Sequence, residues 1–387
     1  MAGKMSTSWI VIPAKAGIQH FQHLLDPDSR FTTCRDRFRR DDVFRRTLVL
    51  FLILVFTLIP SLSFSSTYEP KGPLELKNLN PIYLQFANIS PTRAVTIPKG
   101  RASFSFVNGY ANIFEQGFGA NTSELIDMEL LRSEFKLAAG IYDGMEAGIE
   151  VPFEYGWEGF LDSFIQKYHN FFGFPNGGRE TVPNDEYHYY FRQGTQYVYD
   201  FGRLHYQLGD ITLHFKHNFL DETTARPAVA WLAYLKVPSG NQYRGLGSGS
   251  PDIGFGAVLE KSYKRLHGYL NVGYFLNGGH EYLQQYMHDY YFSYVTGLEL
   301  SVSRPVSILA QISGGTPLMD GTGMTQCDSF PMDLQIGAKG RHALGNGVKY
   351  LKTPVFSWQA GFAEDINPNG PSVDITFLAG VGVDFGL

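Results

Sequence analysis

The sequence has little cysteine, few charged residues and no long hydrophobic run. Its only cysteines are Cys34 and Cys327. We assign Cys34 to a leader that is removed, which leaves Cys327 alone and excludes an intramolecular disulfide or a cysteine-based zinc site. Charged residues are 18% of the 387 residues, and acidic residues outnumber basic ones by 37 to 32. A basic surface for nucleic acid is therefore not indicated.

One apolar run lies near the N-terminus. Residues 47–60, TLVLFLILVFTLIP, form a run of 14 residues. A membrane-spanning helix needs about 20 residues, so this length is typical of the hydrophobic part of a signal peptide. Arg45 and Arg46 supply the preceding positive charge, and Ser65 offers a cleavage site. The alternative is a single anchor helix.

These features divide the chain. We predict that residues 1–46 are a spurious or positively charged leader and that 47–65 are a signal peptide, followed by an irregular N-terminal segment at 66–100. Residues 1–65 hold nine basic and five acidic residues, so the rest of the chain has a net charge of −9.

The part after residue 100 alternates with a period of two residues. In EAGIEVPFEY, Ala147, Ile149 and Val151 point one way and Glu146 and Glu150 the other. Segments of this kind begin near 101, 125, 145, 209, 225, 251, 266, 289, 305, 329, 354 and 371. They are about 10–14 residues long, whereas globular strands average about 5–6 and transmembrane strands need about 9–11. The pattern predicts an all-β protein, a transmembrane antiparallel up-and-down β-barrel of about 12 strands at 101–387.

The connections between these segments alternate in length. We expect outer connections near 114–124, 157–208, 239–250, 278–288, 315–328 and 364–370, with short inner turns between them and a longer one near residues 342–353. Bacterial outer-membrane barrels combine short periplasmic turns with longer outer loops in this way. An even number of strands also leaves both ends in the periplasm.

Charged residues lie opposite the apolar faces of the predicted strands. A barrel of about twelve strands encloses a space that side chains alone do not fill. We expect these residues to line it: Arg132, Glu134, Lys136, Glu146, Glu150, Glu154, His214 and Lys216. Both signs of charge occur, so the alternatives are pairing across strands and selection of a solute.

The longest outer connection, 157–208, contains a helical pattern. FLDSFIQKYHNFF has an amphipathic stripe that Gly173 and Pro175 end, and YHYYFR with TQYVY predicts a hairpin after it. The stripe either closes the barrel mouth as a lid or lies on the outer leaflet. We predict a lid that is made by the following residues: Phe160, Phe164, Ile165, Tyr168 and Phe172.

Several segments carry a family resemblance. PLELKNLNPIYLQFA, DMELLRSEF, LGDITLHFK, LKVPSGNQYRGLGSGSPDIGFG and, most specifically, FLDSFIQKYHNFFGFPNGGRE are similar to a bacterial family called domain of unknown function 3187 (DUF3187). The similarity extends over roughly residues 73–387. The resemblance implies an outer-membrane barrel and supplies no catalytic residues.

Enzymatic and metal chemistry find little support. No G-x-S-x-G motif is present, and GLGSGS at 245–250 enters a strand rather than the helix that a phosphate loop needs. Two sets of metal-ligand types occur without a spacing that specifies a geometry: His280, Glu281, His288 and Asp289, and His169, Asp185, Glu186 and His188. We predict no catalytic residue, no metal and no cofactor.

The sequence thus predicts a Gram-negative outer-membrane barrel that is not an enzyme. The first hypothesis is a channel or transporter for small solutes, gated or plugged by the 157–208 loop. The alternative is a structural or envelope-interaction barrel with a filled lumen, and a lipid-modifying enzyme comes last. Expected partners are outer-membrane lipid, a small-molecule solute in the first hypothesis and the barrel-insertion machinery during assembly.

Overall fold

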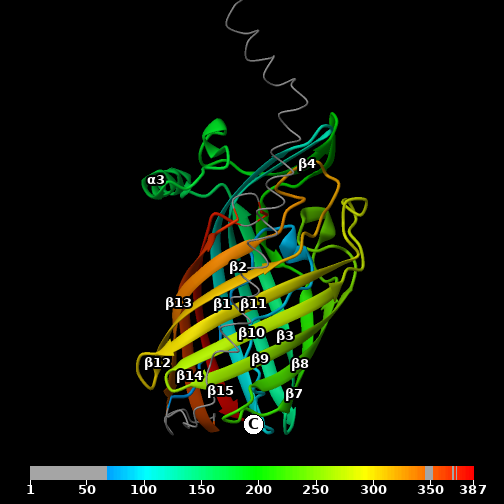
Figure 1. Ribbon diagram of the computed structural model, residues 1–387. Helices are drawn as coiled ribbons and strands as arrows, with labels where there is room; N and C mark the ends of the chain where they lie inside the picture. Colours follow the sequence, from blue (N-terminus) through cyan, green and yellow to red (C-terminus); the bar gives the residue numbers. More distant parts are fainter. Residues whose placement is uncertain (1–67, 345–351, 368–369, 372) are drawn as a thin grey trace, which may run out of the picture. The chain divides into compact units, whose positions relative to one another are not determined.

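The computed structural model describes residues 68–344, 352–367, 370–371 and 373–387 (Figure 1). The predicted leader and signal peptide lie outside the described residues. The strands are β1 (Arg101–Phe118), β2 (Thr122–Tyr142), β3 (Met145–Trp157), β4 (His188–Gln193), β5 (Gln196–Asp200), β6 (Leu204–Leu208), β7 (Ile211–Leu220), β8 (Ala228–Val237), β9 (Asp252–Tyr263), β10 (Leu266–Leu276), β11 (Tyr290–Ser301), β12 (Val306–Gly315), β13 (Met332–Ala343), β14 (Lys352–Asp365) and β15 (Ile375–Gly386). The α-helix is α3 (Asp162–Phe172), and single 3₁₀ turns are η1 (Tyr83–Gln85), η2 (Arg179–Thr181) and η3 (Gln242–Arg244).

Twelve strands of the described chain close into one antiparallel barrel. Each of these strands pairs with its neighbours in chain order, with β7 following β3, and β1 closes the ring by pairing with both β2 and β15. The short strands β4 and β6 extend β2 and β3 beyond the ring. Closure satisfies the backbone of every wall strand internally, which a hydrocarbon environment requires. The predicted fold class and strand number are confirmed.

The two faces of the wall differ as the alternation predicted. On β3, Glu146, Glu150 and Glu154 are buried inside, whereas Tyr155 faces outward. Exposed apolar side chains such as Phe255 and Phe377 cover the exterior of other strands. The result is a transmembrane barrel with an apolar outside and a charged inside. Among the described residues, no helix combines the length and apolarity needed to cross a membrane.

The two ends of the barrel have different connections. The short-turn end holds the turns at 143–144, 221–227, 264–265 and 302–305, together with the C-terminus (Figure 1). The long-loop end holds the larger connections, including α3 and the β4–β5 hairpin. One expected boundary is wrong, because the connection predicted at 114–124 is a tight turn at 119–121. There β1 and β2 continue pairing to Phe118 and Ser123, since β4 extends the sheet above the rest of the wall.

The 157–208 loop has the local order that its sequence predicted. Helix α3 ends at Gly173, whose positive φ of 76° is the left-handed conformation of a helix-ending glycine. Strands β4 and β5 then form a hairpin around Gly194. Most side chains of the helix are exposed, whereas the hairpin carries buried aromatic side chains.

Candidate functional site

Residues 68–98, which we call the plug segment, lie inside the barrel (Figure 1). The segment contains five prolines, and its described regular structure is the single turn η1. Its backbone therefore presents amide and carbonyl groups that no sheet pairs, and buried groups of this kind need partners. Side chains from the inner wall provide them.

Oxygen atoms on the wall accept the amide hydrogens of the plug segment. Glu299 on β11 accepts from the nitrogen of Lys71 at 2.9 and 3.0 Å and from that of Gly72 at 3.1 Å. Gln311 on β12 pairs with both polar atoms of the Leu74 backbone, at 2.8 and 3.0 Å. Further wall acceptors for plug amides are Glu146, Asp252, Glu260, Asn271 and Gln359.

Lysines on the wall donate to the plug carbonyls. Lys339 reaches the oxygen of Pro73 at 2.8 Å, and Lys236 reaches that of Gln85 at 2.7 Å. Lys216 donates to the oxygen of Arg93 at 3.1 Å. Together with the amide acceptors, these contacts engage β3 and every strand from β7 to β14. The plug segment is thus fixed around most of the circumference.

Ion pairs also join plug and wall. Lys77 lies 2.7 Å from Glu150 and 3.3 Å from Glu134, and Arg93 lies 2.7 Å from Glu260. Glu75 in turn lies 3.2 Å from Lys136. Buried charges of opposite sign need such partners, because an unpaired charge inside is strongly destabilising.

The eight residues predicted to line the lumen all lie on the inner wall or at its surface. Arg132 pairs with Glu154 and Glu134, and Lys216 pairs with Glu146 at 2.8 Å. Lys136 and Glu150 join the plug contacts above, and His214 borders the cavity described below. Any role of these residues in selecting a solute stays a prediction.

An apolar cluster fills the lumen near the long-loop end. Plug residues Leu79, Ile82 and Phe86 pack there with loop residues that include Leu283 and Leu318. The β4–β5 hairpin contributes four buried aromatic side chains: Tyr189, Phe191, Tyr199 and Phe201. The hairpin and the plug segment therefore close this end together.

The predicted lid residues on the helical stripe do not share this cluster. Ile165 is buried and Tyr168 is partly buried, whereas Phe160, Phe164 and Phe172 are exposed. The aromatic residues in the mouth come from the hairpin, whose first strand begins at His188, after the end of α3 at Phe172. The alternating YHYYFR and TQYVY segments carried this signal, because each places aromatic residues on one face of a strand. A lid role for the helix stays a prediction.

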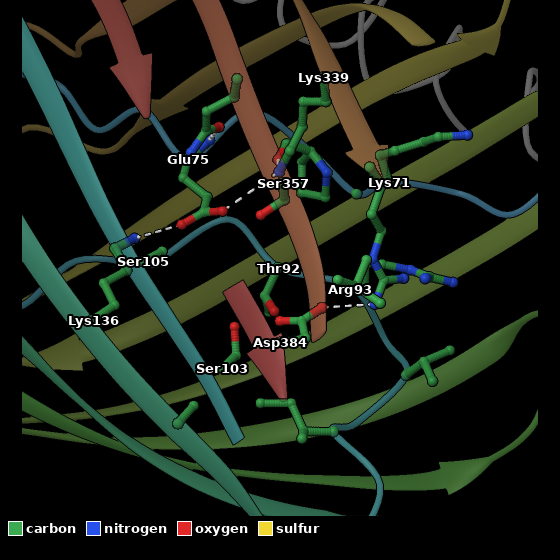
Figure 2. Close-up of a pocket in the computed structure, with 18 of the residues that line it drawn as sticks. Lys71, Glu75, Thr92, Arg93, Ser103, Ser105, Lys136, Lys339, Ser357 and Asp384 are labelled. Atoms are coloured by element: carbon green, nitrogen blue, oxygen red, sulfur yellow. Dashed lines mark hydrogen bonds and ion pairs between the residues drawn. The ribbon is translucent and has the colours of Figure 1, made fainter. Parts of the chain in front are cut away.

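A cavity of about 710 Å³, which we call the vestibule, lies between the plug segment and the inner wall at the short-turn end. Figure 2 shows Lys71, Arg93 and Glu75 of the plug facing it, opposite Ser103 of β1 and Asp384 of β15. Arg304 and Arg341 also border it. A separate cavity of about 30 Å³ lies between plug and wall beside Tyr83 and Tyr291. The vestibule is large enough for a small hydrated solute.

His280 links an outer loop to the plug segment. Its Nδ1 accepts hydrogen bonds from the nitrogens of Tyr282 and Leu283, each at 3.1 Å, and its Nε2 donates to Gln85 at 3.1 Å. Burial, with a smaller effect from the charge of Lys236, lowers the pKa of His280 to about 4. The neutral ring is the form that these contacts require.

The residues suggested as metal ligands are not assembled into a centre. His280 is occupied as described, and His188 instead contacts Glu186 at 2.9 Å on the surface. In the part of the chain that the structure describes, one group has three ligand atoms within 4.8 Å of one another: Glu115, Glu124 and Cys327. Each already has a protein partner, since Asn80 donates to Glu115, and Cys327 donates to Glu124 at 2.7 Å. Burial beside these carboxylates raises the pKa of the Cys327 thiol.

Comparison with known proteins adds a family. A family model described as "Protein of unknown function (DUF3187)" matches residues 47–385. The chain belongs to the DUF3187 family. This confirms the resemblance seen in the sequence. No curated protein matches this DUF3187 chain.

Solved structures that resemble this DUF3187 protein are distant. The COG4313 outer membrane channel from Pseudomonas putida F1 is 12% identical with a TM-score of 0.46, covering 77% of this chain and 100% of the other. The translocator domain of the autotransporter NalP from Neisseria meningitidis is 12% identical with a TM-score of 0.35, covering 75% and 89%. The P. putida toluene transporter TodX is 8% identical with a TM-score of 0.35, covering 84% and 96%. These scores are too low to carry an argument about function.

Sequence reasoning did not find the plug segment. Its prolines and asparagines indicated an irregular segment, and irregular backbone inside a membrane is tolerated where it lies within a protein lumen. The charges that it meets were identified as lumen-facing. A signal in the sequence could have linked the two. The inward-facing positions of the wall include amide side chains, such as Gln311, Gln359 and Asn271, which need hydrogen-bond partners once they are buried.

Proposed function

We propose that this protein is an outer-membrane channel for small polar solutes that is held closed by the plug segment and the β4–β5 hairpin. The outer membrane is proposed because closed barrels with apolar exteriors and long loops at one end are typical of it. A signal-peptide-like run at 47–60 is consistent with export.

The observation that carries the proposal is the mode of attachment around the vestibule. There the plug segment is held by hydrogen bonds and ion pairs, and beside it lies a cavity of about 710 Å³ with charged and hydroxyl side chains on its surface. When the segment leaves, water can hydrate both partners of each hydrogen bond, so the net cost is about 0.5–1.5 kcal/mol per bond, lower than the cost of deleting one partner and leaving the other buried. A segment held in this way can leave, and its departure would join the vestibule to the rest of the lumen.

The alternative is a barrel with a permanently filled lumen and no transport. The apolar cluster at the long-loop end favours it, because Leu79, Ile82 and Phe86 are buried there and their exposure to water would be costly. The two functions differ in whether the plug segment moves under working conditions.

Single-channel conductance in planar bilayers tests the proposal. We would compare the unaltered protein with a release variant, Lys77→Met with Arg93→Met, which removes three ion pairs between plug and wall. Glu222→Gln is the control. It breaks an ion pair with Lys261, whose Nζ lies 3.1 Å from the Glu222 carboxylate, and neither residue belongs to the plug segment. We expect brief, rare openings for the unaltered protein and the control, and frequent openings for the release variant.

Absence of current in a folded release variant would contradict the channel proposal. If the release variant folds, shown by its altered electrophoretic mobility before heating, and still passes no current, the filled-lumen alternative holds.

A further inference from the structure

Helix α3 and the residues beside it expose an aromatic face. Five phenylalanines in fifteen positions are exposed: Phe160, Phe164, Phe171, Phe172 and Phe174. Phe171 reaches 81% exposure. Several of these rings stack on one another rather than on the barrel interior. A concentration of large apolar groups on a surface marks an interaction site.

The loop that carries this face is fixed to the outside of the wall. Arg179, only 2% exposed, donates to Asn112 of β1 at 2.7 Å and also to Asp162 at the start of α3 and to Asp374. Asn112 lies two residues beyond Tyr110 on β1, so it shares the outward face of that strand. Asn112 also donates to Asp162 at 2.9 Å.

Residues that strand pairing places level with Asn112 on the neighbouring strands also hold the helix. Strand pairing aligns Glu129 of β2 with Asn112, and aligns Ile375 of β15 with both Asn112 and Glu364 of β14. Glu129 accepts from the nitrogen of Phe160 at 2.7 Å. Glu364 lies 3.8 Å from His169 of α3. The helix is thus attached through three outward-facing polar residues of one row, which also contains Ile375: Glu129, Asn112 and Glu364.

The next row toward the short-turn end is apolar and faces lipid. It consists of residues that strand pairing places side by side: Leu131, Tyr110, Phe377, Phe362 and Ile336. The first outward-facing amide and carboxylate side chains above this row, Glu129, Asn112 and Glu364, mark the upper edge of the hydrocarbon-facing surface on this side of the barrel. Because α3 is attached at this edge, its exposed aromatic face continues the lipid-facing surface.

We propose that α3 is an interfacial helix, which inserts its exposed phenylalanines among the acyl chains of the leaflet at the long-loop end. The backbone hydrogen bonds of a helix are satisfied internally, which suits this position, and aromatic residues on one face are typical of helices in the membrane interface. The polar residues Ser163 and Asn170 are exposed on the same helix and lie on the side away from Phe164 and Phe171, which provides its water-facing side. This proposal concerns membrane attachment and does not depend on whether the barrel conducts.

Depth-dependent fluorescence quenching tests it with the full mature chain in phosphatidylcholine vesicles. A bimane label is attached to a cysteine placed by Phe171→Cys or Phe164→Cys, and by Asn170→Cys as the matched control on the same helix. The native Cys327 is buried and will not react. We expect a nitroxide on the lipid acyl chain to quench the labels at 164 and 171 several-fold more than the label at 170. Aqueous iodide should show the opposite order.

Two results would overturn the proposal. Labels at 164 and 171 that iodide quenches as strongly as the label at 170 would show an aqueous helix. Labels that neither reagent reaches would show a helix folded into the barrel mouth. Because Phe171 is so exposed, its replacement removes few internal contacts, and unchanged electrophoretic mobility before heating confirms that the barrel is intact.

Discussion

The plug segment and the α3 loop are two non-wall parts of the chain, and they are built in opposite ways. The plug segment has almost no regular structure and depends on wall side chains such as Glu299 and Gln311 for its backbone hydrogen bonds. The α3 loop attaches through a few side chains, centred on Arg179, and its helix satisfies its own backbone. The plug lies inside the wall and the helix outside it.

The difference follows from the surroundings on each side of the wall. A lumen with charged and amide side chains can supply partners to an irregular backbone, whereas lipid supplies none. An irregular segment is therefore tolerated inside, and the part of the outer loop that we propose to enter lipid is a helix.

The largest effect is expected from removing a plug acceptor. Glu260→Ala leaves the half-buried Arg93 without its buried ion-pair partner at 2.7 Å and the Ala94 nitrogen without its acceptor at 3.1 Å. We expect a loss of about 3 kcal/mol in the free energy of unfolding, because a largely buried charge and a buried amide lose their partner together. Urea unfolding in detergent measures it.

The control for this change is Glu69→Ala. Glu69 is a plug residue that lies 4.0 Å from the same arginine and 2.6 Å from Arg341 of the wall, but its side chain is 68% exposed. Exposed pairs contribute about 0–1 kcal/mol. Equal losses for the two variants would show that the plug contacts are as weak as surface contacts, and the contrast between the two regions would disappear.

The second effect is a dependence on pH at the contact between His280 and the plug segment. Burial lowers the pKa of His280 to about 4 from an ordinary 6.5, so the unfolded chain takes up a proton first as the pH falls. Its contribution to stability is complete above about pH 6.5 and is lost between pH 6.5 and 4. The loss is about 3 kcal/mol at ~1.4 kcal/mol per pKa unit.

The variant His280→Asn isolates this dependence. An asparagine oxygen can replace Nδ1 as the acceptor for the loop amides but does not titrate in this range. We expect the unaltered protein to lose more stability than the variant between pH 7 and 4. Parallel pH profiles would place the acid sensitivity elsewhere.

The wall was predictable from the sequence because its information is local. Alternation in EAGIEVPFEY assigns Glu146 to the lumen without knowledge of any other strand, and strand length separates a membrane barrel from a soluble sandwich. Helix α3 was predictable for the same reason, because its amphipathic stripe and the glycine that ends it, Gly173, are local features of the sequence.

The filling of the lumen was not predictable, because its contacts are between residues far apart in the chain. Lys71 meets Glu299, and Leu74 meets Gln311, across more than 200 positions. No periodicity links such pairs. For the helix the sequence left two positions open, a lid on the barrel mouth and the outer leaflet, because an aromatic stripe fits either an apolar cluster or a lipid surface.

A smaller effect is expected where the plug segment leaves the lumen. Gly140 of β2 forms a bridge with Lys99, and a Cβ atom there would lie 2.3 Å from the carbonyl oxygens of Ile97 and Pro98. Gly140→Ala should therefore displace this end of the plug and cost about 1–3 kcal/mol, as overpacking does. Gly202→Ala is the control, since nothing lies within 4 Å of its Cβ position. Increased proteolysis near residues 97–99 in the first variant alone would confirm the displacement.

The smallest effect is expected for an ion pair in the outer loop that water reaches. Glu186 lies 2.9 Å from His188, but their side chains are 44% and 34% exposed. Glu186→Gln should change the free energy of unfolding by less than about 0.5 kcal/mol, because water and salt screen exposed pairs. Urea unfolding at low and high salt checks this. A loss comparable to that of Glu260→Ala would mean that the outer loop is fixed by its charges as firmly as the plug segment is, and that the side of the wall does not determine how an insertion is held.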